Sequence, residues 1–192
     1  MKTLSVVMAF IFILEIPSFL SSSSWHPGLE IPEYFTREEF EENLVDFHKK
    51  IEEFRNILGI KSPIIVVDGY KAYSTSQYGG MIFIGRLHCM DKDGSLMGTL
   101  MHEEGHISLG HFNDGVPEIS ELHRQQEYDA DCFGLEKIYQ VGGLGFVLDY
   151  ADHHKEFIDP SDSEEKEKNS THPLSSKRYQ AILDYAKSHG WM

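Results

Sequence analysis

The chain has 192 residues, and 17 lysines and arginines against 31 aspartates and glutamates give it a formal net charge of −14. Its 41% apolar and 12% aromatic residues suffice for a hydrophobic core, which excludes a disordered chain, while the scarcity of positive charge argues against a nucleic-acid partner or an anionic membrane surface. Two cysteines, Cys89 and Cys132, exclude a disulfide-rich scaffold and an all-cysteine zinc site.

Residues 1–24 have the pattern of a signal peptide or an N-terminal membrane anchor. Lys2 precedes an apolar run, Leu4 to Leu14, which is shorter than the ~20 apolar residues that span a bilayer. The serines at 21–24 offer a cleavage region. A cleaved signal, an uncleaved anchor and a core helix of a cytosolic protein remain open, and we expect an exported protein, periplasmic or secreted. No other segment has the length of a membrane span, so we expect no further transmembrane domain.

Residues 25–192 are expected to form one domain, which begins with a helix. Thr36 and Glu39 make a capping-box pattern, and apolar residues then recur at three- and four-residue steps as far as Leu58. This pattern predicts a helix over about 36–58 that stops at Gly59, followed by a core over about 60–192.

The first part of this core is predicted to contain a small sheet. Residues 63–67 read as a buried strand, a short second strand is suggested around Ala72 and Tyr73, and residues 81–85 read as a third strand bounded by glycines.

Helices are predicted for the rest of the chain. We expect them over about 94–109, 118–139 and 144–156, with a break at Gly142 and Gly143, and a last one from Pro173 to about His189. The charged stretch 159–170 has no large apolar residue and reads as a loop. The order helix, sheet, helices indicates an α+β fold.

The strongest chemical signal is the H-E-x-x-H motif at His102, Glu103 and His106. Residues four apart on a helix project from one face, so the two imidazoles can bind one zinc ion, and Glu103 can accept a proton from a water there. The surrounding leucines and isoleucine indicate a buried helix. Burying these polar groups is costly unless a metal ion or hydrogen bonds compensate.

A catalytic zinc ion needs a third protein ligand. The spacing of Gly110 and His111 is one residue away from the metzincin pattern, which excludes that scheme. A glutamate from the following helix fits better, and Glu127 is the favoured candidate, with Glu121 and Asp129 as competitors. Asp131 lies four residues after Glu127 and is expected to accept a hydrogen bond from a ligand histidine.

Four blocks, in order, resemble the gluzincin metalloendopeptidases that include the CAAX prenyl protease, HtpX, the Oma-type protease and the periplasmic BepA-like proteases. The blocks are GGMIFIG at 79–85, TLMHEEGHISLGH at 99–111, EYDADCFGL at 127–135 and THPLSSKR at 171–178. They frame about 100 residues, and the chain resembles the compact soluble or periplasmic members, because no membrane helix pair separates them. The short connection between the motif and Glu127 also weakly resembles the zinc proteins that cleave phage-type repressors.

The resemblance implies a zincin-like fold, one zinc ion and a role for each matched residue. His102, His106 and Glu127 would bind the metal, Glu103 would be the general base, and Asp131 would orient a ligand. His172 would stabilise the oxyanion and Arg178 would form a structural ion pair. An edge strand, comprising Gly80, Met81, Ile82, Phe83 and Ile84, would pair with an extended protein or peptide substrate.

The leading hypothesis from the sequence is therefore a zinc-dependent metalloendopeptidase. The alternative is a non-catalytic, zinc-containing binding or chaperone-like protein that holds extended polypeptides. His111, His123, His153 and His154 are interpreted as residues outside the ligand set, and the last three as surface residues. A disulfide between Cys89 and Cys132 and a glycosylation sequon at Asn169 remain possibilities that depend on export.

Overall fold

The computed structural model describes residues 37–67, 69, 71–75, 80–112 and 120–192. Every described residue belongs to one compact unit, Ile31–Met192. The predicted signal or anchor at 1–24 therefore lies outside the described residues. None of the described helices is long and apolar enough to cross a membrane.

Three short strands form a mixed sheet. They are β1 (Ile64–Val67), β2 (Ala72–Thr75) and β3 (Met81–Gly85), in the spatial order β1-β3-β2. β1 runs parallel to β3, whereas β2 runs antiparallel to it. Ile82 and Ile84 of β3 are fully buried, and β3 contacts helix α2 (Asp93–Ser108), which places the core on the α2 side of the sheet.

The sheet order corrects one prediction from the sequence. Gly80–Ile84 was expected to be an edge strand, but β3 is the middle strand and pairs on both sides. The reason is β2, a four-residue strand with a weak sequence signal that pairs along β3 and takes the edge position. Gly80 precedes β3 with φ +98, and an added Cβ there would come within 2.6 Å of the Ile107 side chain.

The predicted first helix is confirmed as α1 (Arg37–Leu58). Its buried face consists of Phe47, Ile51, Phe54 and Leu58, at the spacing expected of an amphipathic helix. Gly59 ends it with φ +73, a left-handed conformation that glycine adopts without strain. After the sheet, residues Arg86–Met90 form a short 3₁₀ helix, η3, which leads into α2.

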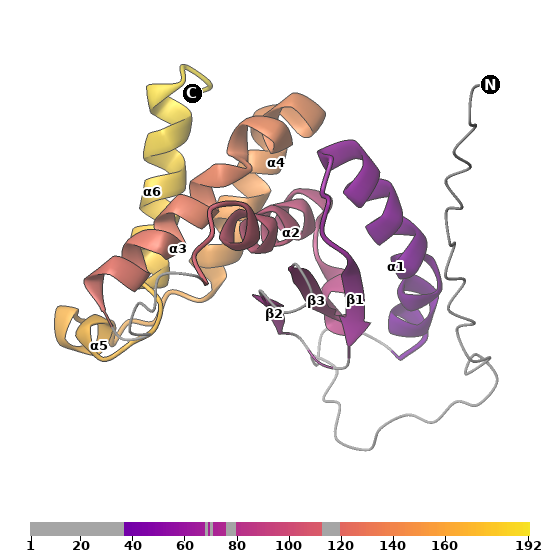
Figure 1. The fold of residues 1–192 in the computed structure, drawn as a ribbon, viewed down its shortest axis with the longest axis horizontal. Helices are drawn as coiled ribbons and strands as arrows, with labels where there is room; N and C mark the ends of the chain where they lie inside the picture. Colours follow the sequence, from indigo (N-terminus) through magenta and orange to yellow (C-terminus); the bar gives the residue numbers. More distant parts are fainter. Residues whose placement is uncertain (1–36, 68, 70, 76–79, 113–119) are drawn as a thin grey trace, which may run out of the picture. The chain divides into compact units, whose positions relative to one another are not determined.

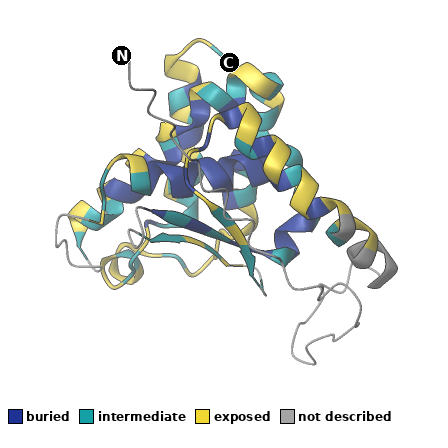
Figure 2. Ribbon diagram, turned by 45° about the vertical axis from the view of Figure 1, so that its right-hand side comes forward, coloured by how far each residue is buried: buried dark blue, intermediate teal, exposed yellow. Residues whose placement is uncertain are grey.

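Helix α2 is the central element of the fold. It lies between the sheet and a group of helices that includes α3 (Glu121–Phe133), α4 (Leu135–Glu156) and α6 (Ser175–Ser188) (Figure 1). Every residue from Gly94 to His106 is buried, including both motif histidines, and buried residues gather along this helix (Figure 2). The motif therefore lies in the interior of the domain, as its apolar neighbours predicted.

The helices after α2 follow the predicted order, with one additional break at Gly134. The long helix expected to continue to Tyr139 ends at Phe133, and Gly134 separates α3 from α4. Gly134 is packed against α2, since an added Cβ would come within 2.3 Å of Met101. The predicted break at Gly142 and Gly143 is confirmed, since Gly143 has a non-helical backbone, with φ 65 and ψ −161, and forms a kink between two helical stretches of α4. The charged loop contains one short helix, α5 (Glu164–Lys168). The α+β class predicted from the sequence is confirmed.

Candidate metal centre

Helices α2 and α3 bring three buried side chains together: His102, His106 and Glu127. The two histidines share a face of α2 because they are four residues apart. Gly105 of the same helix allows α3 to approach closely, since an added Cβ would lie 3.1 Å from Ala130 Cα. This close approach places Glu127, three residues before Ala130, opposite the two imidazoles.

The distances between the three side chains fit a metal ion. His102 Nε2 lies 3.1 Å from His106 Nε2, and these atoms lie 3.6 and 3.3 Å from the two carboxylate oxygens of Glu127. Two ligand atoms bound to zinc at ~2.0–2.1 Å and at a tetrahedral angle are about 3.3 Å apart. The buried Glu127 Oε2 accepts no hydrogen bond in the described structure, as expected of an oxygen that can bind a cation. This His-His-Glu group could therefore hold a metal ion.

The competing acidic candidates are not part of this group. Glu121 is exposed in the first turn of α3, and the exposed Asp129 accepts a hydrogen bond from Gln125 at 3.0 Å. His111 also does not join the ligand atoms, but its Nδ1 lies 3.0 Å from Nδ1 of His106. It can thereby fix the orientation of the His106 ring, so that Nε2 is directed at the centre.

Asp131 lies where the sequence predicted, beside a ligand histidine. Its Oδ1 is 2.9 Å from Nδ1 of His102, so it can accept a hydrogen bond from the ring N–H at Nδ1, which leaves Nε2 free to bind a metal. Tyr150 donates a hydrogen bond to the same oxygen at 2.7 Å, and Arg178 donates to both carboxylate oxygens. Burial raises the pKa of Asp131, but the charge and hydrogen bonds of Arg178 outweigh it and hold this pKa well below its ordinary value.

The predicted structural ion pair of Arg178 is thus with Asp131. Arg178 comes from α6, and its Nη2 also lies 3.3 Å from His102 Nδ1. Two helices that follow α3 in the chain, α4 through Tyr150 and α6 through Arg178, therefore support the carboxylate that is hydrogen bonded to His102. Because the Arg178–Asp131 ion pair is buried, loss of either charge would leave the other without compensation and would destabilise the folded protein.

Glu103 faces the sheet, not the solvent. Its Oε2 accepts a hydrogen bond from Ser74 Oγ of β2 at 2.6 Å. The neighbouring Glu104 has a different position, since its Oε1 lies 3.4 Å from the backbone N of Lys61. Ser74 was not identified from the sequence, because a lone serine on a weakly predicted strand carries no motif.

Two further histidines flank Glu127. His172, half-exposed, has its Nε2 3.4 Å from Glu127 Oε2, and His123 Nε2 lies 3.8 Å from Glu127 Oε1. His172 therefore lies beside Glu127, and its approach to a metal ion stays a prediction. His123 was interpreted as a surface residue, although its spacing of four residues before Glu127 is a signal that places both side chains on one face of α3.

Three other residues considered in the sequence analysis, Cys89, Cys132 and His154, lie outside the His102–His106–Glu127 group. Cys89 and Cys132 are both free thiols, and burial raises the pKa of each to about 11, so neither is activated as a thiolate. His154 is buried, in contrast to its predicted surface position. Burial, together with the nearby charge of Arg178, lowers its pKa to about 3.

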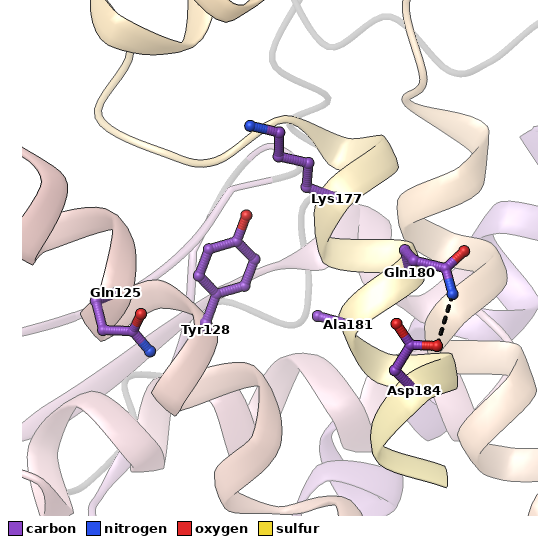
Figure 3. A pocket seen from close by; sticks show the side chains of 6 residues that line it. All are labelled: Gln125, Tyr128, Lys177, Gln180, Ala181 and Asp184. Carbon is purple, nitrogen blue, oxygen red and sulfur yellow. Dashed lines mark hydrogen bonds between the residues drawn. The ribbon is translucent and has the colours of Figure 1, made fainter. Parts of the chain in front are cut away.

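A shallow hollow of about 390 Å³ lies between α3 and α6 (Figure 3). Figure 3 shows its lining residues, which are Gln125, Tyr128, Lys177, Gln180, Ala181 and Asp184. None of the residues predicted to bind metal or take part in catalysis is among them.

Comparison of the chain with models of protein families, with curated proteins and with solved structures gave no match.

Proposed function

We propose that this protein is a zinc-dependent metalloendopeptidase with a minimal gluzincin-like fold. The observation that supports this most is the grouping of His102, His106 and Glu127 at tetrahedral ligand spacing, with Glu103 between the two histidines on the same helix. Two imidazoles and one carboxylate form a set that leaves a fourth coordination position for water, as catalytic zinc sites require.

His102, His106 and Glu127 would hold the ion, and zinc bound there would polarise both a water molecule and the substrate carbonyl. Glu103 acts as the general base: its carboxylate accepts a proton from the attacking water and then passes it to the leaving amine. Ser74 holds one oxygen of Glu103, which leaves Oε1 to receive this proton. His172, half-exposed beside Glu127, donates a hydrogen bond to the oxyanion that develops on the attacked carbonyl.

An extended substrate would bind along β2. The order β1-β3-β2 leaves one side of β2 without a partner strand among the described residues, and β2 carries the serine that contacts Glu103. A peptide that adds to this edge by backbone hydrogen bonds passes directly beside the proposed base. Substrate pairing is therefore assigned to β2 and not to Gly80–Ile84.

The function is tested by zinc analysis and a peptidase assay on full-length protein with unfolded protein substrates. We expect one zinc ion per chain and cleavage that stops when a chelator is added. Glu103→Gln should keep the zinc and lose about 100-fold or more of kcat, because general acid–base catalysis contributes ~10²–10⁴-fold.

The matched control is Glu104→Gln, which makes the same isosteric change one residue along, where the carboxylate faces Lys61. This variant should keep its activity. Full cleavage by Glu103→Gln would contradict the assignment of the base. Zinc binding without cleavage of any substrate by wild-type protein would instead support the alternative, a zinc-containing protein that holds extended chains.

A further inference from the structure

The face of the sheet turned away from α2 carries a row of apolar side chains. Since Ile82 and Ile84 are fully buried toward α2, Phe83 between them points to the opposite face. The strand register places Ile65 of β1 and Tyr73 of β2 on either side of Phe83. Ile65 is 40% exposed and Tyr73 is 47% exposed, so the row ends with an exposed aromatic side chain on β2, which pairs only with β3 among the described residues.

Tyr73 is exposed, but its ring packs on a neighbouring aromatic ring. Its ring stacks on that of Phe83, with centroids 4.8 Å apart and an interplanar angle of 9°. A half-exposed tyrosine packed in this way offers a large contact area at low cost in conformational entropy. Its neighbour Ser74 points to the other face and is hydrogen bonded to Glu103, so Tyr73 lies one residue from the contact with the proposed base.

We propose that Tyr73 determines substrate specificity by selecting a large apolar or aromatic side chain in the substrate. This inference rests on the proposed function, because it assumes that the extended chain pairs with β2. Directly opposite residues of paired strands share a face, with Cβ atoms ~4.5–5.5 Å apart. The substrate residue opposite Tyr73 therefore extends the row Ile65–Phe83–Tyr73 by one position, next to the residue that faces Glu103.

The test uses extended peptides in which a single phenylalanine is moved along a sequence of small residues, with cleavage sites mapped by mass spectrometry. Wild-type protein with zinc should prefer phenylalanine over alanine at one position near the cut by about fivefold, as expected for a cross-strand aromatic pair. Tyr73→Thr, which keeps a good strand former, should lose this preference, and Tyr73→Phe should keep it.

Ile65→Ala is the matched control. It removes exposed apolar surface from the same face, but on β1, which is separated from β2 by β3 and does not pair with it. This variant should keep the preference of the wild type. Equal loss of the preference in Ile65→Ala, or its retention in Tyr73→Thr, would overturn the inference.

Peptide binding separates this inference from the proposed function. The same peptides, labelled for fluorescence anisotropy, are titrated into zinc-loaded Glu103→Gln protein with and without the Tyr73→Thr change. Phenylalanine-dependent binding that requires Tyr73 would support the specificity assignment even if wild-type protein cleaved none of the peptides, a result that would refute only the peptidase proposal. Binding that does not depend on phenylalanine would overturn the assignment.

Discussion

Replacing Gly98 by alanine should disturb the metal centre from a distance. Gly98 lies on α2 where α4 crosses it, and an added Cβ would come within 2.1 Å of the Tyr150 ring. Tyr150 is only 2% exposed, so its ring has no open space to move into. The substitution must therefore separate the two helices or displace Tyr150, whose hydroxyl donates to Asp131 at 2.7 Å.

The magnitude follows from three contributions. Overpacking a core costs ~1–3 kcal/mol, loss of a hydrogen bond to a carboxylate costs ~1.5–3 kcal/mol, and the better helix propensity of alanine returns ~1 kcal/mol. We expect Gly98→Ala to lower the free energy of unfolding by about 1.5–5 kcal/mol and to weaken zinc affinity, since Asp131 then orients His102 less well.

Urea unfolding of the zinc-free protein measures the first effect and zinc titration the second. Gly145→Ala is the control, because Gly145 is also helical but has no atom within 4 Å of an added Cβ, so this change should be neutral or slightly stabilising. In a Tyr150→Ala background the Gly98 substitution should cost little, since the ring that it would strike is gone. If Gly98→Ala were as stable as Gly145→Ala, the close packing of α2 on α4 would be refuted.

Three further predictions concern the polar side chains of His154, Asp131 and Ser74. The folded-state pKa of His154, about 3, lies below its ordinary value of 6.5, so its stabilising contribution is complete above pH 6.5 and is lost as the pH falls toward 3. His154→Phe should therefore lose about 2 kcal/mol less unfolding free energy between pH 7 and pH 5 than wild type, as measured by urea unfolding. Asp131→Asn leaves the Arg178 guanidinium without its countercharge and should cost ~3–5 kcal/mol and 10–100-fold in zinc affinity, with Asp129→Asn as the exposed control; unchanged affinity would contradict the orienting role. Ser74→Ala should lower kcat several-fold at constant KM, and Ser74→Thr should restore it; a change confined to KM would show that Ser74 does not act through Glu103.

The grouping of His102, His106 and Glu127 could be predicted from the sequence because helical spacing is a local rule. His102 and His106 are four residues apart, as are Glu127 and Asp131, and each pair shares one face of its own helix whatever the rest of the chain does. The apolar residues around the motif also indicated that it is buried, and the structure has both histidines less than a tenth exposed. The proposed roles of these residues stay predictions until activity is measured.

The strand order could not be predicted, because it depends on pairing between segments and not on the pattern within each. β3 has a strong apolar sequence bounded by glycines, but its position in the sheet is decided by β2, a four-residue segment with little signal of its own. The position of Ser74 beside Glu103 follows from that pairing. The break at Gly134 was also missed; Gly134 packs against Met101 of α2, a contact between helices that no local sequence pattern shows.

The central claim, that His102, His106 and Glu127 bind a zinc ion, is tested most directly by anomalous diffraction at the zinc absorption edge from crystals of the protein purified with zinc. We predict one anomalous peak within ~2.0–2.2 Å of His102 Nε2, His106 Nε2 and a carboxylate oxygen of Glu127. A zinc ion bound elsewhere, or none at this site in protein supplied with the metal, would contradict the proposal.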